Sequence, residues 1–93
     1  MTVELIPNCV HAPQMGVANK TFFTMVNSSG MDSIIGKQST NDELVVNGKD
    51  SLLMLQKLKN WNPPKNWGGG LKPGEMKEYF IDFFRRCDGF TTR

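Results

Sequence analysis

The sequence has few of the residues that most often carry chemistry. Its 93 residues include one histidine and two cysteines. No stretch approaches the roughly 20 consecutive apolar residues that a membrane-spanning helix needs. No His, Cys and Asp set has metal-ligand spacing, and no nucleophile elbow, phosphate loop or pair of catalytic carboxylates is recognisable. We therefore expect a protein that is not an enzyme, binds no metal or cofactor and does not enter a membrane.

The two cysteines are too few to build a disulfide scaffold. They are expected to be reduced thiols, and the alternative is one Cys9–Cys87 disulfide that joins the two ends of the chain. The N-terminal residues MTVELIPN have neither the basic segment nor the apolar stretch of a secretory signal. These features favour a cytoplasmic location.

What the sequence does contain is the composition of a small globular domain. Hydrophobic residues make up 39% and charged residues 22% of the chain. Leu, Ile, Val and Phe together number 23, a content above that of disordered chains. A chain of this length supports one hydrophobic core, so we expect a single domain over residues 1–93.

Alternation and side-chain type predict strands in the first half. Residues 2–6 alternate between apolar and polar. Residues 21–27 read TFFTMVN, and a glycine-ended turn follows, so residues 21–36 are expected to form a hairpin. Residues 7–19 are expected to be a loop. Residues 43–46 are expected to be a strand, with a short helix from a capping box at residues 40–43 as the alternative.

Helical spacing predicts two helices in the second half. Leucines at helical spacing follow Asp50, a good N-cap, which predicts a helix over residues 51–60. Residues 75–87 combine an apolar stripe with acids in the first turn and arginines in the last, which complements the helix dipole. The fold class is therefore α+β, a small antiparallel sheet of three or four strands packed against two helices. The side chains expected to face the helices are Val3, Leu5, Phe23, Met25, Ile35, Leu44 and Val46.

Charge is distributed unevenly along the chain. Residues 1–47 contain two lysines and four acids, whereas residues 48–93 contain nine basic and five acidic residues. Residues 49–72 alone hold five lysines and one aspartate. This asymmetry directs attention to the second half.

The segment 59–74, which we call the Trp–Gly loop, is the most unusual part of the sequence. It contains both tryptophans, three of the five prolines and four of the nine glycines. Exposed Trp usually marks a contact surface, paired prolines stiffen the backbone, and consecutive glycines expose amides that favour an anion. The candidate binding residues are Trp61, Lys65, Trp67, Gly68, Gly69, Gly70 and Lys72.

Three interpretations of the Trp–Gly loop are open. The first is a non-catalytic interaction protein, for example an inhibitor, that binds a larger protein partner through this loop. The second is a single-stranded nucleic-acid or nucleotide binder, with bases stacked on the Trp faces and additional contacts from Lys57 and Lys59. The third is structural, with the Trp rings capping the core while the lysines stay in solvent. The sequence does not fix an oligomeric state.

Two short segments are similar to a known family. Residues 7–13, PNCVHAP, resemble the active-site loop of histidine-containing phosphocarrier proteins, and residues 46–53, VNGKDSLL, resemble their regulatory serine segment. The resemblance implies a phosphate-carrying His11 and an open β-sandwich with three helices. However, the arginine before Pro13 is absent, the family's helix after the histidine is replaced by the strand-like residues 21–27, and the Trp–Gly loop stands where the family has its last strand. We therefore expect His11 to be an ordinary loop residue.

Overall fold

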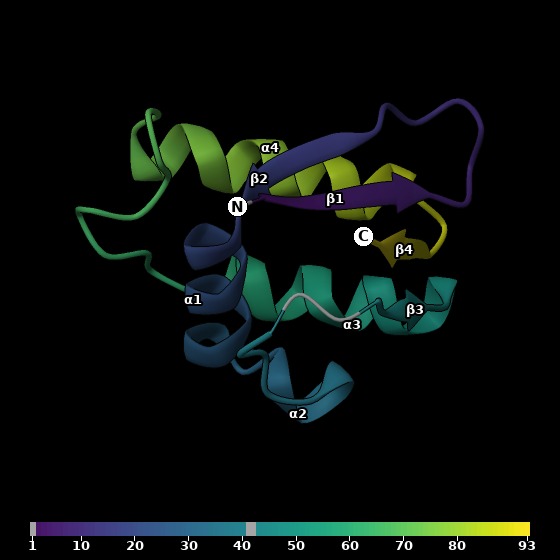
Figure 1. Cartoon of the computed structure of the whole chain (residues 1–93), viewed down its shortest axis with the longest axis horizontal. Helices are drawn as coiled ribbons and strands as arrows, with labels where there is room; N and C mark the ends of the chain where they lie inside the picture. Colours follow the sequence, from purple (N-terminus) through teal and green to yellow (C-terminus); the bar gives the residue numbers. More distant parts are fainter. Residues whose placement is uncertain (1, 41–42) are drawn as a thin grey trace.

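The computed structural model describes residues 2–40 and 43–93 (Figure 1). Its described residues form one four-stranded antiparallel sheet and four helices, which confirms the α+β class. In chain order the elements are β1 (Thr2–Pro7), β2 (Met15–Ala18), α1 (Asn19–Ser29), α2 (Asp32–Ile35), β3 (Val45–Val46), α3 (Gly48–Lys59), α4 (Pro73–Arg86) and β4 (Phe90–Thr92).

Strand β1 is one of the two inner strands of the sheet, whose order is β2-β1-β4-β3. It pairs with β2 through Leu5 opposite Met15 and with β4 through Ile6 opposite Thr91. The predicted alternation of β1 is confirmed, because Val3 and Leu5 are buried and face the helices. The short strand β4 was not predicted, because its three residues form a strand only by pairing with β1 and β3 on both sides.

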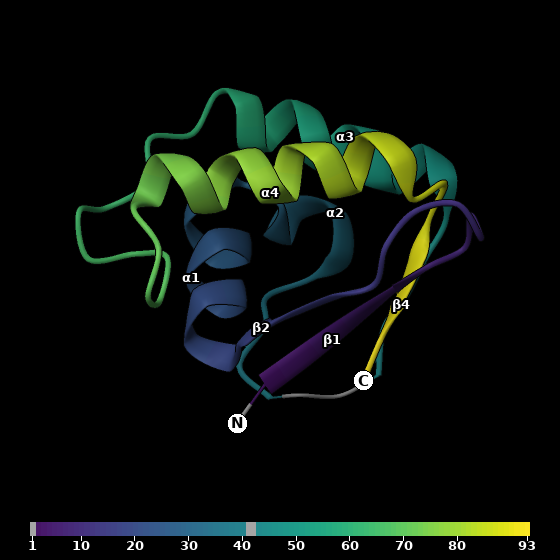
Figure 2. The same ribbon diagram turned by 90° about the horizontal axis from the view of Figure 1, so that it is seen from above.

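One face of the sheet is covered by helices. Figure 2 shows α3 and α4 running side by side along one side of the sheet, above the strands in this view, with α1 at one end. The residues buried between the sheet and the helices include Val3, Leu5, Val17, Phe22, Met25, Val26, Met54, Leu58, Phe80, Phe84 and Phe90. The opposite face carries exposed residues of β1 and β2, including Thr2, Glu4 and Gly16.

The predicted hairpin over residues 21–36 is wrong. Residues 21–27 belong to helix α1, in which Phe22, Met25 and Val26 are buried at i, i+3 and i+4 spacing. The glycine of the expected turn, Gly30, does adopt a left-handed conformation with φ 96°, but as the C-cap of α1. Phe23, Met25 and Ile35 therefore lie on helices and not on the sheet.

The loop predicted over residues 7–19 is also partly wrong, because residues 15–18 form strand β2. Of the predicted strand 43–46, Val45–Val46 forms β3. The alternative helix there would begin at residues 40–43, and two of these, 41 and 42, lie outside the described residues.

Both predicted helices are confirmed with small changes at their ends. Helix α3 begins earlier than expected because Asn47, and not Asp50, is the N-cap: the Asn47 side-chain oxygen accepts a hydrogen bond from the Asp50 N–H at 2.8 Å. Helix α4 has Pro73 in its first turn, Glu75 close behind it, and Arg85 and Arg86 in its last turn.

A tight turn at Asp88 and Gly89 connects α4 to β4. Both residues have positive φ, 53° and 90°. A Cβ on Gly89 would lie 2.6 Å from Asn8 Nδ2 and 2.7 Å from the Val46 carbonyl oxygen. Only glycine satisfies both the backbone conformation and this close approach.

We predict that Gly89→Ala lowers the free energy of unfolding by about 2 kcal/mol, because it adds left-handed strain and a clash with the Asn8 side chain and the Val46 carbonyl oxygen. Urea unfolding followed by circular dichroism measures the loss. The matched control is Gly74→Ala in the first turn of α4, where no heavy atom lies within 4 Å of the added Cβ, so its stability should stay the same or rise slightly. Equal losses in the two variants would contradict this account of the turn.

Candidate functional site

Both tryptophans of the Trp–Gly loop are part of the core. Trp61 is 9% exposed and Trp67 is 5% exposed. The two rings meet edge to face with centroids 5.0 Å apart, and Trp67 stacks on Phe80 at 6.0 Å. The Trp67 Nε1–H donates a hydrogen bond to the carbonyl oxygen of Thr21 in α1 at 2.8 Å. The indole faces are therefore occupied by the protein itself, as the structural interpretation of the loop expects.

The other candidate residues of the loop divide into two groups. Gly68 is buried and has φ 116°, and a Cβ there would lie 2.8 Å from the Leu71 carbonyl oxygen. This glycine therefore serves the turn, which the Leu71 N–H closes by donating to the Gly68 carbonyl at 3.1 Å. The remaining candidates are exposed at the outside of the loop: Lys65, Gly69, Gly70 and Lys72.

The Trp–Gly loop is also fixed to helix α4. The Lys77 ammonium donates to the carbonyl oxygen of Trp61 at 2.7 Å and more weakly to that of Lys59 at 3.4 Å. Together with the buried indole rings, this contact holds the loop at one end of the molecule.

A small hollow lies between the loop and the start of α1. It has a volume of about 180 Å³. Lys20 stands in the first turn of α1, which contains no acidic residue, so the positive end of the helix dipole and a lysine coincide here. The hollow is lined by Ala18, Lys20, Thr21, Thr24, Asn66, Trp67, Gly68 and Gly69.

A longer apolar groove lies on the other side of the loop, between β2 and α4. One part has a volume of about 300 Å³ and a second part, which shares Gln14, Met15 and Tyr79 with it, about 230 Å³. Tyr79 is 60% exposed and Leu71 is 38% exposed, and both belong to its wall. We call it the β2–α4 groove, and its lining residues are Pro13, Gln14, Met15, Gly16, Val17, Leu71, Met76, Tyr79, Asp82 and Phe83.

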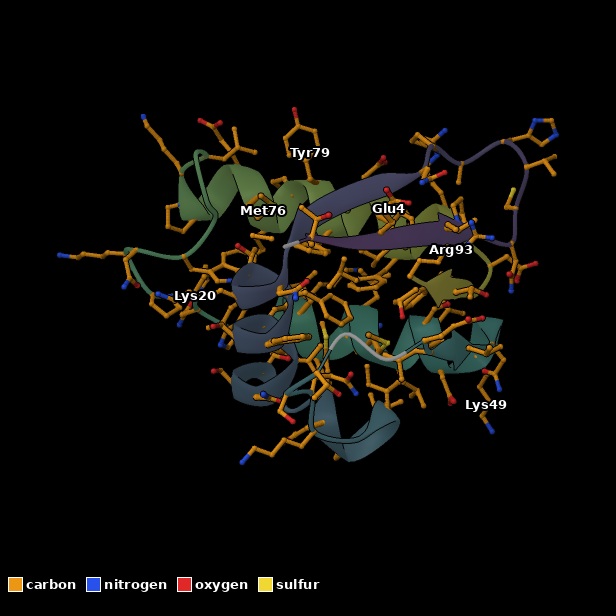
Figure 3. All side chains as sticks on the ribbon, viewed as in Figure 1. Glu4, Lys20, Lys49, Met76, Tyr79 and Arg93 are labelled. Carbon is orange, nitrogen blue, oxygen red and sulfur yellow. The ribbon has the colours of Figure 1, made fainter. Side chains whose placement is uncertain are left out.

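Sequence reasoning missed the β2–α4 groove. Its wall on the sheet side is β2, which was predicted to be a loop. The helix side of the groove did have a signal in the sequence. Tyr79 follows Met76 by three residues and precedes Phe83 by four, so the three side chains share one face of the helix beside the apolar stripe. Figure 3 shows Tyr79 pointing away from the body of the molecule, with Met76 beneath it at the level of β2.

The excess positive charge of the second half is not collected at the Trp–Gly loop. Lys49, Arg85 and Arg86 line a separate hollow with Asp88 at the junction of α3 and α4. Figure 3 shows Lys49 and Lys20 at opposite ends of the molecule. The structure therefore does not unite the basic residues in one continuous stripe of the kind that tracks a nucleic-acid backbone.

The two cysteines are free thiols, although their backbones touch. The Cys9 N–H donates to the Cys87 carbonyl oxygen at 2.9 Å, while Cys9 is half-buried and Cys87 is buried. Burial raises the pKa of the Cys87 thiol, and a hydrogen bond with Ser51 partly opposes this rise. The alternative of a disulfide between the two ends is not what the structure shows.

His11 lies in the exposed turn between β1 and β2, and its carbonyl oxygen accepts a hydrogen bond from Arg86 at 3.2 Å. Within residues 2–40 and 43–93, no group of three His, Cys, Asp or Glu residues could hold a metal ion. Over the same residues, no helix is long and apolar enough to cross a membrane.

No family model matches the chain, and comparisons with curated proteins and with solved structures give no significant match. The resemblance of residues 7–13 and 46–53 to phosphocarrier proteins therefore has no support beyond those segments. One reason given against it was wrong, because residues 21–27 are helical.

We predict that Trp67→Phe lowers the free energy of unfolding by about 1–2 kcal/mol, because it removes a buried hydrogen bond and part of a packed ring. Thermal and urea unfolding measure the loss. Lys65→Ala, on the exposed side of the same loop, is the control and should change stability by less than about 0.5 kcal/mol. A stable Trp67→Phe protein would mean that the indole is not a structural support.

We also predict that the two thiols differ in reactivity. A thiol-specific disulfide reagent at neutral pH should label Cys9 in the folded protein and Cys87 only on unfolding, because burial both shields Cys87 and disfavours its thiolate. The raised pKa also means that Cys87 contributes stability below about pH 9, its ordinary thiol pKa being 9.0, and that this contribution is lost as pH rises through the folded-state pKa. Mass spectrometry after timed labelling tests the order, and simultaneous labelling of both residues would refute it.

Proposed function

We propose that this protein is a non-catalytic binding module that attaches to a larger protein partner. The observation that carries the proposal is the β2–α4 groove. It collects the exposed side chains of Leu71 and Tyr79 with the half-buried Met15 and Met76 in one continuous depression. Apolar side chains gathered in an open groove of a small protein are typical of a contact surface.

The outer part of the Trp–Gly loop belongs to the same proposed surface. Leu71 in the wall of the groove follows the exposed Gly69 and Gly70 and precedes the exposed Lys72. Trp61 and Trp67 support this segment from within and do not touch the partner. A loop held in place before binding loses little conformational entropy on association, which favours tight attachment. An inhibitor that covers a site on its partner is one form that such a module takes.

A second candidate function is binding of a nucleotide or a single-stranded nucleic acid at the same loop. The observation in its favour is the hollow beside Lys20, with Asn66 and Gly69 in its wall. Burial of both indole rings removes base stacking from this candidate, so only phosphate contacts remain, from Lys20, Lys65 and Lys72. Binding of this kind weakens steeply with salt.

Photo-crosslinking tests the first proposal. A photoreactive phenylalanine analogue at position 79 should give a specific covalent adduct with one protein in the cells that express this chain. The matched control is the same analogue at Leu53, an apolar residue of α3 that is 45% exposed and does not line the groove. No adduct at position 79, or the same adducts at both positions, would overturn the proposal.

The second candidate has its own measurement. Titration of a short fluorescent oligothymidylate at low salt should then show binding that Lys20→Ala weakens several-fold and that Lys49→Ala leaves unchanged. Absence of binding at low salt would eliminate this candidate.

A further inference from the structure

Strand β2 is an edge strand with backbone groups turned outward. Glu4 and Arg93 exchange two backbone hydrogen bonds of 3.0 Å, so the N–H and C=O of Glu4 point toward the β4 side of β1. Hydrogen-bonded and non-hydrogen-bonded pairs alternate along an antiparallel ladder. Gly16, opposite Glu4, therefore does not bond to β1, and the N–H and C=O of Gly16 point toward the open edge. The N–H of Ala18, opposite Thr2, also points toward the open edge.

The open edge of β2 lacks the features that usually prevent an edge strand from pairing with a strand of another chain. Strand β2 reads MGVA and contains no lysine, no proline and no charged side chain. Nothing lies within 4 Å of the position that a Cβ on Gly16 would occupy, so the face of the sheet beside this edge is also uncovered. Apart from its short length, the edge is suited to accept another strand.

Helix α4 extends the apolar layer beyond this edge. In Figure 1, β2 is the uppermost strand and α4 runs behind it at a similar height. Tyr79 and Met76 of α4 stand where the next strand of the sheet would pack, and Leu71 adds to the same uncovered surface. A fifth strand next to β2 would cover these side chains and satisfy the outward groups of Gly16.

The charged side chains at the rim of the β2–α4 groove indicate what kind of polypeptide segment binds there. On α4, Glu75 precedes Tyr79 by four residues and Asp82 follows it by three, so both flank Tyr79 on the helix surface. Asp82 pairs with Arg86 at 3.2 Å, whereas within the described part of the chain no ion pair involves Glu75 or Glu78. Lys72 is an exposed cation at the loop end of the rim, so the unpaired negative charge lies along α4 at Glu75 and Glu78, and it attracts a basic segment there. It disfavours a second copy, because two copies joined through β2 would bring their α4 helices and the same acids together.

We infer that the β2–α4 groove binds an extended, basic peptide segment of the partner as a fifth strand of the sheet. The inference rests on the proposed function and specifies its partner. The segment hydrogen-bonds to the outer edge of β2 at Gly16, packs alternate apolar side chains on Met76 and Tyr79, and places a Lys or Arg beside Glu75.

Peptide selection tests the inference. Random peptides displayed on phage are selected on the intact protein, and the most enriched one is synthesised as the probe. We expect alternating apolar residues and a net positive charge in this probe. Gly16→Pro should weaken its binding at least about tenfold, because it removes an outward N–H without touching the ladder to β1. Tyr79→Ala should weaken binding similarly, and Leu53→Ala should leave it unchanged.

N-methylation of the probe provides a test that does not depend on folding of a variant. In an extended peptide, alternate N–H groups face β2 and the others face away from it. Methylation of the N–H groups that face β2 should abolish binding, and methylation of the others should have little effect. If both methylated forms of the probe bind equally well and the probe also tolerates Gly16→Pro, the added-strand inference is overturned but the proposed function stays intact. If the protein forms a dimer that Gly16→Pro dissociates, the inference is also overturned, because a second copy of the chain then occupies the edge of β2. Absence of both an enriched peptide and a crosslinked partner at position 79 overturns the inference and the proposed function together.

Discussion

A continuous series of aromatic rings in contact with one another is the interaction on which the rest of the structure depends. It passes from Trp61 and Trp67 in the loop, through Phe80 and Phe84 of α4, to Phe90 of β4, with neighbouring centroids 5.0–6.0 Å apart. Each ring contributes a large buried area, and the contacts join three segments that are otherwise connected by loops. The hydrogen bond from Trp67 to Thr21 extends the series to α1. The series therefore fixes the loop, the last helix and the C-terminal strand as one unit.

The proposed binding surface follows from this arrangement. Phe80, Phe83 and Phe84 occupy the buried face of α4. Tyr79 therefore lies on the side of the helix near the edge of the sheet, where it is only partly covered. The same rigid loop presents Leu71 beside it. The open backbone of β2, the apolar groove and the acidic rim then coincide at one edge of the molecule. Three separate physical properties at this edge, hydrogen bonding, hydrophobicity and charge, favour the same kind of partner.

The parts of the fold that sequence predicted are those fixed by local patterns. Helix α4 was predicted from its apolar stripe and its terminal charges, and β1 from its alternation. Residues 21–27 were misassigned because β-branched and aromatic residues outweighed the helical spacing of Phe22, Met25 and Val26, which tertiary packing makes decisive. Strands β2 and β4 have four and three residues and depend on pairing between distant segments, so no local pattern specifies them. Composition marked the Trp–Gly loop as unusual, but the same residues suit an exposed or a buried Trp, and only the fold distinguishes the two. The groove could not be predicted without β2.

Amide hydrogen exchange resolved residue by residue tests the central claim, that β2 offers an open edge for a further strand, most directly. In the free protein, the N–H groups of Met15 and Val17 should be protected and those of Gly16 and Ala18 should exchange rapidly, because only the first pair bonds to β1. Addition of the selected peptide should slow exchange at Gly16 and Ala18 specifically. Strong protection of Gly16 in the free monomer, or unchanged rapid exchange in the complex, would contradict the account.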